Sequence, residues 1–324
     1  VSYRDDNRYL WVFLEEAEEE SDFNSDHGAQ NRQNDAQVDG LLPPQHYPEW
    51  DTNVQNYRPD WATVYEALQQ PGNASDIDQL LDKHRLLSRQ LKQIVDLLKP
   101  QQRKRVRYQE EGDELDLDTA IRAAIDHRIG STPDTRIHQS YVKDGRDIAV
   151  LLLIDLSQSI NEIPPGAEHS ILQLSQEAVA LMAEAVEGLG DSFAIAGFSS
   201  NTRHEVRYTH LKSFGEDWGH DPKARLAAIK AGESTRMGAA LRHASRYLEN
   251  RKEEKRLLLL LTDGEPHDID VQDPKYLQDD THVAVNELES KGITTYCITL
   301  DPNADDYVAD IFGRNNYTVI DRVE

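Results

Sequence analysis

Apolar residues recur with two different periods along this chain, and the two periods alternate after residue 147. Continuous aliphatic and β-branched runs, bounded by turn residues, predict strands over 148–154, 191–200, 256–264, 293–301 and 316–321, with a shorter strand near 204–208. Three-and-four spacing predicts helices over 168–189, from Met237 to about 250, from about 273 and from about 303, with helical character over 221–230. Buried strands that alternate with helices favour right-handed βαβ units. We therefore predict an α/β fold with a doubly wound, mainly parallel sheet.

The chain before this pattern has a different composition, and we divide it at residues 40 and 135. Residues 1–40 include the tract 15–40, which is acidic and almost free of aliphatic side chains, so we expect a disordered or loosely packed segment. A solvated linker is the simpler interpretation of this tract, and attraction of a basic partner surface is the alternative. Residues 41–135 form a predicted amino-terminal extension, helical or irregular, and residues 136–324 form the main domain.

Proline and aromatic residues are concentrated in the first part of the extension, 41–71. We expect irregular extended backbone that packs over the outside of the domain, with a peptide-binding surface as the alternative. Ser75 and Asp78 form a capping motif for a helix that reaches about Leu98. His84 falls on the apolar face of this helix, so we interpret it as a packing residue rather than a ligand.

Three shorter elements are expected before the central strand. Residues 103–109 form a basic strand whose charge pairs with the acidic residues that follow, and an amphipathic helix is expected near 117–128. Residues 136–142 are expected to form a hairpin with the central strand and so to lead into the main sheet.

The charge balance excludes some functions. The 35 lysines and arginines are outnumbered by 59 aspartates and glutamates, which gives a formal charge of -24, and residues 1–60 carry 14 acidic against 4 basic residues. Phosphate backbones are repelled by such a chain, so no nucleic-acid partner is expected. No apolar stretch approaches the length of a membrane span, and no leader opens the chain. We expect a cytoplasmic protein without membrane insertion, and its start at Val1 rather than Met is expected of a segment of a longer protein.

Cysteine and histidine do not form a recognisable ligand pattern. The single cysteine, Cys297, lies in an apolar run, so we read it as a buried hydrophobic residue and exclude an internal disulfide. Several histidines are scattered rather than placed at metal-ligand spacing. They are His204, His210, His220, His243 and His267.

Polar residues occupy alternate positions at the carboxyl end of the central strand. Asp155, Ser157 and Ser159 follow the apolar run, so on an extended backbone their oxygens face the same side. A carboxylate with two hydroxyls is a hard oxygen donor set, which suits Mg²⁺ or Mn²⁺ rather than zinc. By itself the pattern is weak, because serine and aspartate also cap helices and fill turns.

Two further loops are expected to reach the same edge of the sheet. Thr235 precedes the predicted helix that opens with M-G-A-A-L, and Asp263 ends a predicted strand just before Gly264. Ligands in sheets of this type lie beyond the carboxyl ends of the strands. The sequence therefore predicts a metal site made by Asp155, Ser157, Ser159, Thr235 and Asp263.

This set of five residues resembles the metal-ion-dependent adhesion site of von Willebrand factor A (VWA) domains, and the spacing and strand context match over 147–322. The resemblance implies a Mg²⁺ beside Asp155 and both serines, which Thr235 joins directly or through water and Asp263 through water. It also implies a sixth coordination position for an acidic side chain of a partner. The alternative is that these residues only cap helices and turns.

A more extensive resemblance covers most of the chain. Several segments resemble the carboxyl-terminal part of the CbbO/NorD family: LLPPQHYPEWD (41–51), RVRYQEEGDELDLDTAI (105–121), GSTPDTRIHQSYVKDGRDIAVLLLIDLSQS (130–159), STRMGAALRHA (234–244) and ITTYCITLDPNADDYVADIFG (293–313). Members of this family pair with hexameric AAA+ ATPases of the MoxR class, named CbbQ and NorQ. CbbO brings the motor to inhibited Rubisco, and NorD serves the maturation of nitric oxide reductase.

Segment 193–214 looks more similar to CbbO, so we favour the Rubisco hypothesis over nitric oxide reductase as the alternative. The large amino-terminal region expected of either protein is not part of this sequence, which puts binding of the motor by this segment in doubt.

No enzyme motif accompanies the predicted metal site. The chain has no G-x-x-x-x-G-K-[ST], G-x-G-x-x-G, H-E-x-x-H or G-x-S-x-G motif, and no histidine stands close to Ser157 in sequence as a base. We therefore expect a non-catalytic adaptor that recognises its target through a Mg²⁺-bridged carboxylate. A metal-dependent hydrolase is the alternative, because folding can bring distant residues together.

Overall fold

The computed structural model describes residues 43–85, 103–112, 114–143, 147–163, 169–299, 304 and 307–320. Within these limits the chain forms two units. The large unit combines residues up to 92 with residues from 147 onward, and the small unit comprises residues 93–146. The predicted acidic segment 1–40 lies outside the described residues.

The large unit is built on one sheet. Among the described residues it has eight strands, in the order β1 (Gln45–Asp51), β2 (Asn56–Leu68), β8 (Val206–Lys212), β7 (Ser192–Ser200), β6 (Ile148–Asp155), β9 (Lys255–Thr262), β10 (Ile293–Thr299) and β11 (Tyr317–Val319). The strands from β7 to β11 in this order are parallel to their neighbours, whereas β8 is antiparallel to β7. The predicted mainly parallel α/β sheet is confirmed.

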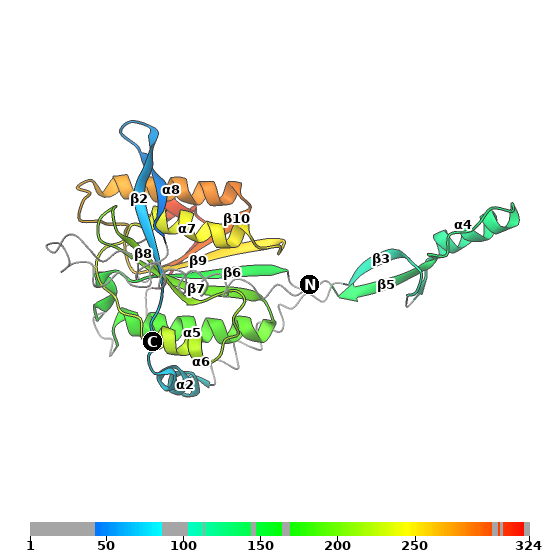
Figure 1. The fold of residues 1–324 in the computed structure, drawn as a ribbon, viewed down its shortest axis with the longest axis horizontal. Helices are drawn as coiled ribbons and strands as arrows, with labels where there is room; N and C mark the ends of the chain where they lie inside the picture. Colours follow the sequence, from blue (N-terminus) through cyan, green and yellow to red (C-terminus); the bar gives the residue numbers. More distant parts are fainter. Residues whose placement is uncertain are drawn as a thin grey trace, which may run out of the picture. The chain divides into compact units, whose positions relative to one another are not determined.

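Helices cover both faces of this sheet, as the doubly wound prediction requires (Figure 1). One face carries α7 (Met237–Glu249), α8 (Pro274–Ser290) and α9 (Val308–Phe312), and the other carries α2 (Ala74–Lys83), α5 (Ile171–Leu189) and α6 (His220–Ala227). Alternate residues of β6 contribute to the two cores, because successive side chains of a strand point to opposite faces. Leu151 and Leu153 pack on the α7 side, and Leu152 and Ile154 on the α5 side.

The helix before β7 shows how local sequence sets its limits. Ser170 accepts a hydrogen bond from the Gln173 N–H at 3.3 Å, and the Gln173 side chain accepts one from the Ser170 N–H at 3.1 Å. This capping box starts α5 at Ile171, three residues later than predicted. The helix ends where Gly190 adopts φ 75°, a left-handed conformation that glycine adopts readily.

The prediction of irregular backbone over 41–71 is wrong, because β1 and β2 extend the main sheet. Strand β2 pairs in parallel with β8, and β1 pairs antiparallel with β2. Prolines are tolerated on an edge strand such as β1, and Pro48 coincides with the register shift between Tyr47 and Glu49, where the regular pairing is interrupted. Residues 43–85 therefore belong to the large unit rather than to a separate extension.

The helix that follows β2 begins two residues earlier than the predicted capping motif implies. Asn73, not Ser75, is the N-cap, and its side chain accepts a hydrogen bond from the Ser75 N–H at 3.2 Å. The predicted extension of this helix to Leu98 lies outside the described residues. His84 is half-buried, with its Nε2 3.4 Å from the Glu177 carboxylate of α5.

The small unit contains a three-stranded antiparallel sheet in the order β3 (Arg103–Gln109), β5 (His138–Lys143) and β4 (Glu114–Leu115), together with α4 (Leu117–Arg128). The predicted hairpin between 136–142 and the central strand is wrong, because β5 pairs with β3 and β4 instead. The boundary predicted at residue 135 accordingly falls inside the small unit. Arg107 pairs with Asp116 and with Asp118, as expected for the basic strand.

Cys297 is fully buried in β10, as predicted. Within the described part of the chain, none of the helices combines the length and the apolar character that crossing a membrane requires.

Candidate metal centre

The predicted site residues come from three adjacent segments at the carboxyl edge of the main sheet. Asp155 is the last residue of β6, and Ser157 and Ser159 follow it into a short 3₁₀ turn (Gln158–Asn161). Asp263 directly follows β9, the neighbour of β6. Thr235 lies two residues before α7.

Side-chain hydrogen bonds join these five residues into one cluster. The Ser157 and Ser159 hydroxyls lie 3.0 Å apart, and the Ser159 hydroxyl donates to Asp263 Oδ1 at 3.0 Å. The Thr235 hydroxyl lies 3.3 Å from both carboxylate oxygens of Asp155, and the Ser157 N–H donates to Asp155 Oδ1 at 2.9 Å. The fold therefore brings together residues that are up to 108 positions apart in the sequence.

Backbone contacts hold the Thr235 loop beside this cluster. Thr235 and His267 exchange two hydrogen bonds, of 2.7 and 3.0 Å, and Ser234 and Ser200 exchange two of 2.8 Å. The Gln158 N–H donates to the Glu233 carbonyl at 2.9 Å. The loop is thus connected to the segments after β6, β7 and β9, so the position of the Thr235 hydroxyl depends on all three.

The electrostatics of the cluster leave negative charge without a partner. Burial raises the pKa of Asp155, which is 1% exposed. Burial, and then the charge of Asp155, raise the pKa of Asp263 to about 6. Among the described residues, no lysine, arginine or histidine forms an ion pair with either carboxylate. A bound cation would relieve both the burial of charge and the mutual repulsion.

The donor chemistry fits a small, hard divalent cation. Two carboxylates and three hydroxyls are oxygen ligands of the kind that Mg²⁺ and Mn²⁺ accept. Within the described residues, no group of three or more His, Cys, Asp or Glu side chains is placed to hold a metal. The cluster around Asp155 differs from such groups because three of its five oxygen donors are hydroxyls.

Comparison with known proteins agrees with this fold. Residues 149–322 match the family model of the von Willebrand factor type A domain. This chain belongs to that family. Strand β6, which carries Asp155, opens the matched region, and Thr235 and Asp263 lie inside it.

Relatives of this VWA protein are similar over most of its length. It is 36% identical over 276 residues to an uncharacterized protein of Pseudomonas aeruginosa, covering 85% of this chain and 44% of that protein. It is 34% identical over 273 residues to the protein NorD of Stutzerimonas stutzeri, covering 84% of this chain and 44% of NorD. The chain spans less than half the length of these relatives.

Among solved structures, the vWF domain of the type V pili tip protein Mfa5 from Porphyromonas gingivalis is similar with 10% identity and a TM-score of 0.42. The match covers 53% of this chain and 89% of that one.

Sequence reasoning missed one residue that contacts this cluster, Thr262. Its hydroxyl donates to Asp155 Oδ2 at 2.8 Å, and its side chain is buried. The signal was available, since a polar residue ends an otherwise aliphatic strand just before Asp263. A threonine there is also a common strand residue, so the pattern alone does not predict the contact.

The histidines, predicted to be scattered, are brought together in one case. His210 and His243 flank the carboxylate of Glu66 from β2, at 2.8 and 3.1 Å. Burial alone would raise the pKa of Glu66, but the bonds to the two histidines outweigh it and lower that pKa. This buried cluster attaches β2 to α7 and β8, which is a structural role.

Proposed function

We propose that this chain is a non-catalytic recognition module that binds a target protein through a divalent cation. Asp155, Ser157, Ser159, Thr235 and Asp263 would hold Mg²⁺, with Mn²⁺ as a substitute. The observation that carries the proposal is the convergence of these five oxygen donors around two carboxylates that lack a cationic partner among the described residues. When bound, the ion supplies a positive charge to which a carboxylate of the target can bind.

The protein's own residues explain why such an ion would remain attractive to a target. Only Asp155 and Asp263 contribute formal charge, whereas the other three donors are neutral hydroxyls. Two carboxylates balance a divalent ion without an excess of negative charge, so an additional carboxylate is not repelled by the site. The Ser157 hydroxyl lies 3.0 Å from that of Ser159, and no histidine or lysine of the described residues forms a hydrogen bond with it, which supports a binding role over nucleophilic catalysis.

The names of the relatives favour one of the two candidate target proteins. Several proteins that are 34% identical to this chain are named NorD. They support the nitric oxide reductase alternative better than the Rubisco hypothesis. The support for the Rubisco hypothesis is the resemblance of segment 193–214 to CbbO. We accordingly propose a NorD-like accessory protein in nitric oxide reductase maturation, working with a MoxR-class AAA+ ATPase as the family resemblance implies.

The test is a capture experiment with purified target. This chain is immobilised and exposed to nitric oxide reductase or to Rubisco from the same organism, with Mg²⁺ or with EDTA. Asp155→Ala is compared with Asp221→Ala, which removes an exposed carboxylate on α6 that pairs with His220. We expect the reductase to be retained only with Mg²⁺, by the wild type and Asp221→Ala but not by Asp155→Ala.

Two other outcomes would change the proposal. Retention that is unaffected by EDTA and by Asp155→Ala would contradict recognition through a metal. Retention of Rubisco instead of the reductase would keep the metal-bridged mechanism and reverse the choice of target.

A further inference from the structure

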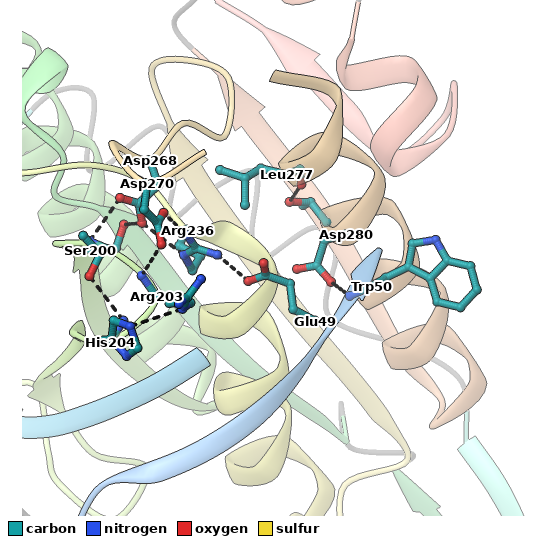
Figure 2. Close-up of polar contacts among 12 residues, drawn as sticks. Glu49, Trp50, Ser200, Arg203, His204, Arg236, Asp268, Asp270, Leu277 and Asp280 are labelled. Atoms are coloured by element: carbon teal, nitrogen blue, oxygen red, sulfur yellow. Dashed lines mark hydrogen bonds and ion pairs between the residues drawn. The ribbon is translucent and has the colours of Figure 1, made fainter. Parts of the chain in front are cut away.

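The residue next to Thr235 is at the centre of a buried ionic network. Arg236 is 0% exposed and pairs with three carboxylates, each through a different guanidinium nitrogen (Figure 2). Nε bonds Asp268 at 3.0 Å, Nη2 bonds Asp270, and Nη1 bonds Glu49. A buried arginine is stable only when its donors are satisfied in this way, so the network fixes the position of its backbone as well.

Asp268 extends the network to the loop after β7. Its Oδ2 accepts a hydrogen bond from the Ser200 hydroxyl at 2.9 Å, and its Oδ1 accepts one from the Thr202 N–H at 3.1 Å. Ser200 is also in the backbone bridge to Ser234, directly before Thr235. The Arg236 network therefore connects the same loops that place the Thr235 hydroxyl beside Asp155.

Glu49 is the member of the network that comes from outside the matched VWA region. It lies on β1, 1% exposed, and residues 149–322 alone would lack it. The next residue fixes its position, because the Trp50 N–H donates to Asp280 Oδ1 of α8 at 2.7 Å (Figure 2). Asp280 is itself buried and paired with Arg242 of α7 at 2.9 Å. A continuous series of contacts thus leads from α8 through β1 to Arg236.

Losing Glu49 would leave Nη1 of Arg236 without its carboxylate in a buried environment. Asp268 and Asp270 would still pair with the guanidinium, so the fold should survive. The guanidinium would keep its contacts with Asp268 and Asp270 but lose the contact with β1. The backbone of the adjoining Thr235 would then be less firmly positioned. Groups that orient ligand residues in this way typically affect metal affinity strongly.

We propose that Glu49 is a positioning residue for Thr235, acting through Arg236, and that β1 is consequently part of the metal centre. This inference rests on the proposed metal site. The inference also states that Glu49 stabilises the Thr235 loop, and this stabilisation can be measured in the absence of metal.

The experiment uses the full chain with Glu49→Gln and Glu49→Leu, and Glu66→Gln as the matched control. Glu66 is also a buried carboxylate of the β1–β2 pair, but it contacts His210 and His243 rather than Arg236. Hydrogen exchange of peptides that contain Thr235, measured in EDTA, reports the loop, because the Thr235 N–H donates to the His267 carbonyl. Calorimetric titration with Mg²⁺ reports the site.

We expect both Glu49 variants to speed exchange around Thr235 and to weaken Mg²⁺ binding by about tenfold, with Glu49→Leu the stronger. Glu66→Gln should leave both quantities near the wild-type values. Unchanged exchange and affinity in the Glu49 variants would overturn the inference, as would equal effects of Glu66→Gln. Faster exchange in the Glu49 variants, with no Mg²⁺ binding by the wild type, would support the positioning role and refute the proposed metal function.

Discussion

The Thr262 hydroxyl donates a 2.8 Å hydrogen bond to Asp155 Oδ2 from the neighbouring strand. Both side chains are buried, at 2% and 1% exposure, so water cannot replace this bond easily. The Thr235 hydroxyl and the Ser157 N–H also contact the Asp155 carboxylate. Thr262 therefore helps to fix the orientation of Asp155, and among the described residues its hydroxyl also forms hydrogen bonds with the backbone of Gly264.

Thr262→Val is expected to weaken Mg²⁺ binding by about tenfold and to destabilise the metal-free protein by about 1–3 kcal/mol. The cause is the lost donor, since valine has nearly the same shape as threonine. Urea unfolding in EDTA measures the stability, and calorimetric titration measures the affinity. Thr295→Val is the control, because Thr295 is fully buried and its hydroxyl has no hydrogen-bond partner in the described structure.

Thr295→Val should leave Mg²⁺ affinity unchanged and should be neutral or stabilising, because it removes an unsatisfied buried hydroxyl. If Thr262→Val and Thr295→Val behave alike in both assays, the hydrogen bond to Asp155 does not support the site.

Gly238→Ala is expected to destabilise the protein, contrary to the usual effect of this change in a helix. A Cβ at this position of α7 would lie 2.1 Å from Asp280 Oδ2 and 3.0 Å from its Cγ. Asp280 is buried and bonded to Arg242 and to the Trp50 N–H, so it cannot move away freely. We expect a loss of about 1–3 kcal/mol in unfolding free energy, which outweighs the intrinsic advantage of alanine.

Gly188→Ala is the matched control, because Gly188 lies in α5 with its surface exposed. It should be neutral or slightly stabilising. A stable Gly238→Ala variant would mean that the contact between α7 and α8 is loose enough to adjust.

The main sheet could be predicted because the apolar residues of its strands and of its helices recur with different spacings along the sequence. The positions of the site residues could be predicted for a related reason: Asp155 and Asp263 lie at the ends of strands with aliphatic runs, and Thr235 lies just before a helix, so parallel topology places all three at one edge. What the sequence could not supply is long-range pairing. Glu49 and Arg236 are 187 positions apart, and no local pattern links them.

The misassigned strands have a similar explanation. Pro48 and Pro59 suggested irregular backbone, but a proline is compatible with a strand when the missing N–H breaks no hydrogen bond. Strand β5 was assigned to the wrong sheet because its register with β3 and β4 depends on tertiary contacts rather than on its own residues.

Arg107→Gln is expected to destabilise the small unit by about 1–3 kcal/mol, because the buried Asp116 carboxylate loses its arginine. Hydrogen exchange of β4, β5 and α4 should become faster, whereas peptides of β6 and β9 should be unaffected. Arg136→Gln is the control, since Arg136 is exposed and pairs with the exposed Asp134. Equal effects of the two variants would contradict a specific role for the Arg107 pair.

Lys212→Met is expected to change the pH dependence of stability. Lys212 is 2% exposed, and its ammonium donates to the Phe193 carbonyl at 2.8 Å but forms no ion pair with a carboxylate of the described residues. Burial lowers the pKa of Lys212 to about 8, although the charges of Glu187, Glu216 and Asp217 oppose the shift. The folded state therefore binds fewer protons than the unfolded state between about pH 8 and the ordinary lysine value of 10.5.

Across that window the free energy of unfolding contributed by Lys212 must rise with pH, and below about pH 8 it stays constant at its least favourable value. Lys212→Met removes this pH-dependent contribution. The stability of the variant relative to the wild type should therefore fall between about pH 8 and 10.5, by an amount on the order of 3 kcal/mol at most. Chemical denaturation at several pH values measures the difference. Lys255→Met, which replaces an exposed lysine on β9, should show a constant difference. A constant difference for Lys212→Met as well would mean that the buried amine keeps its proton throughout this range.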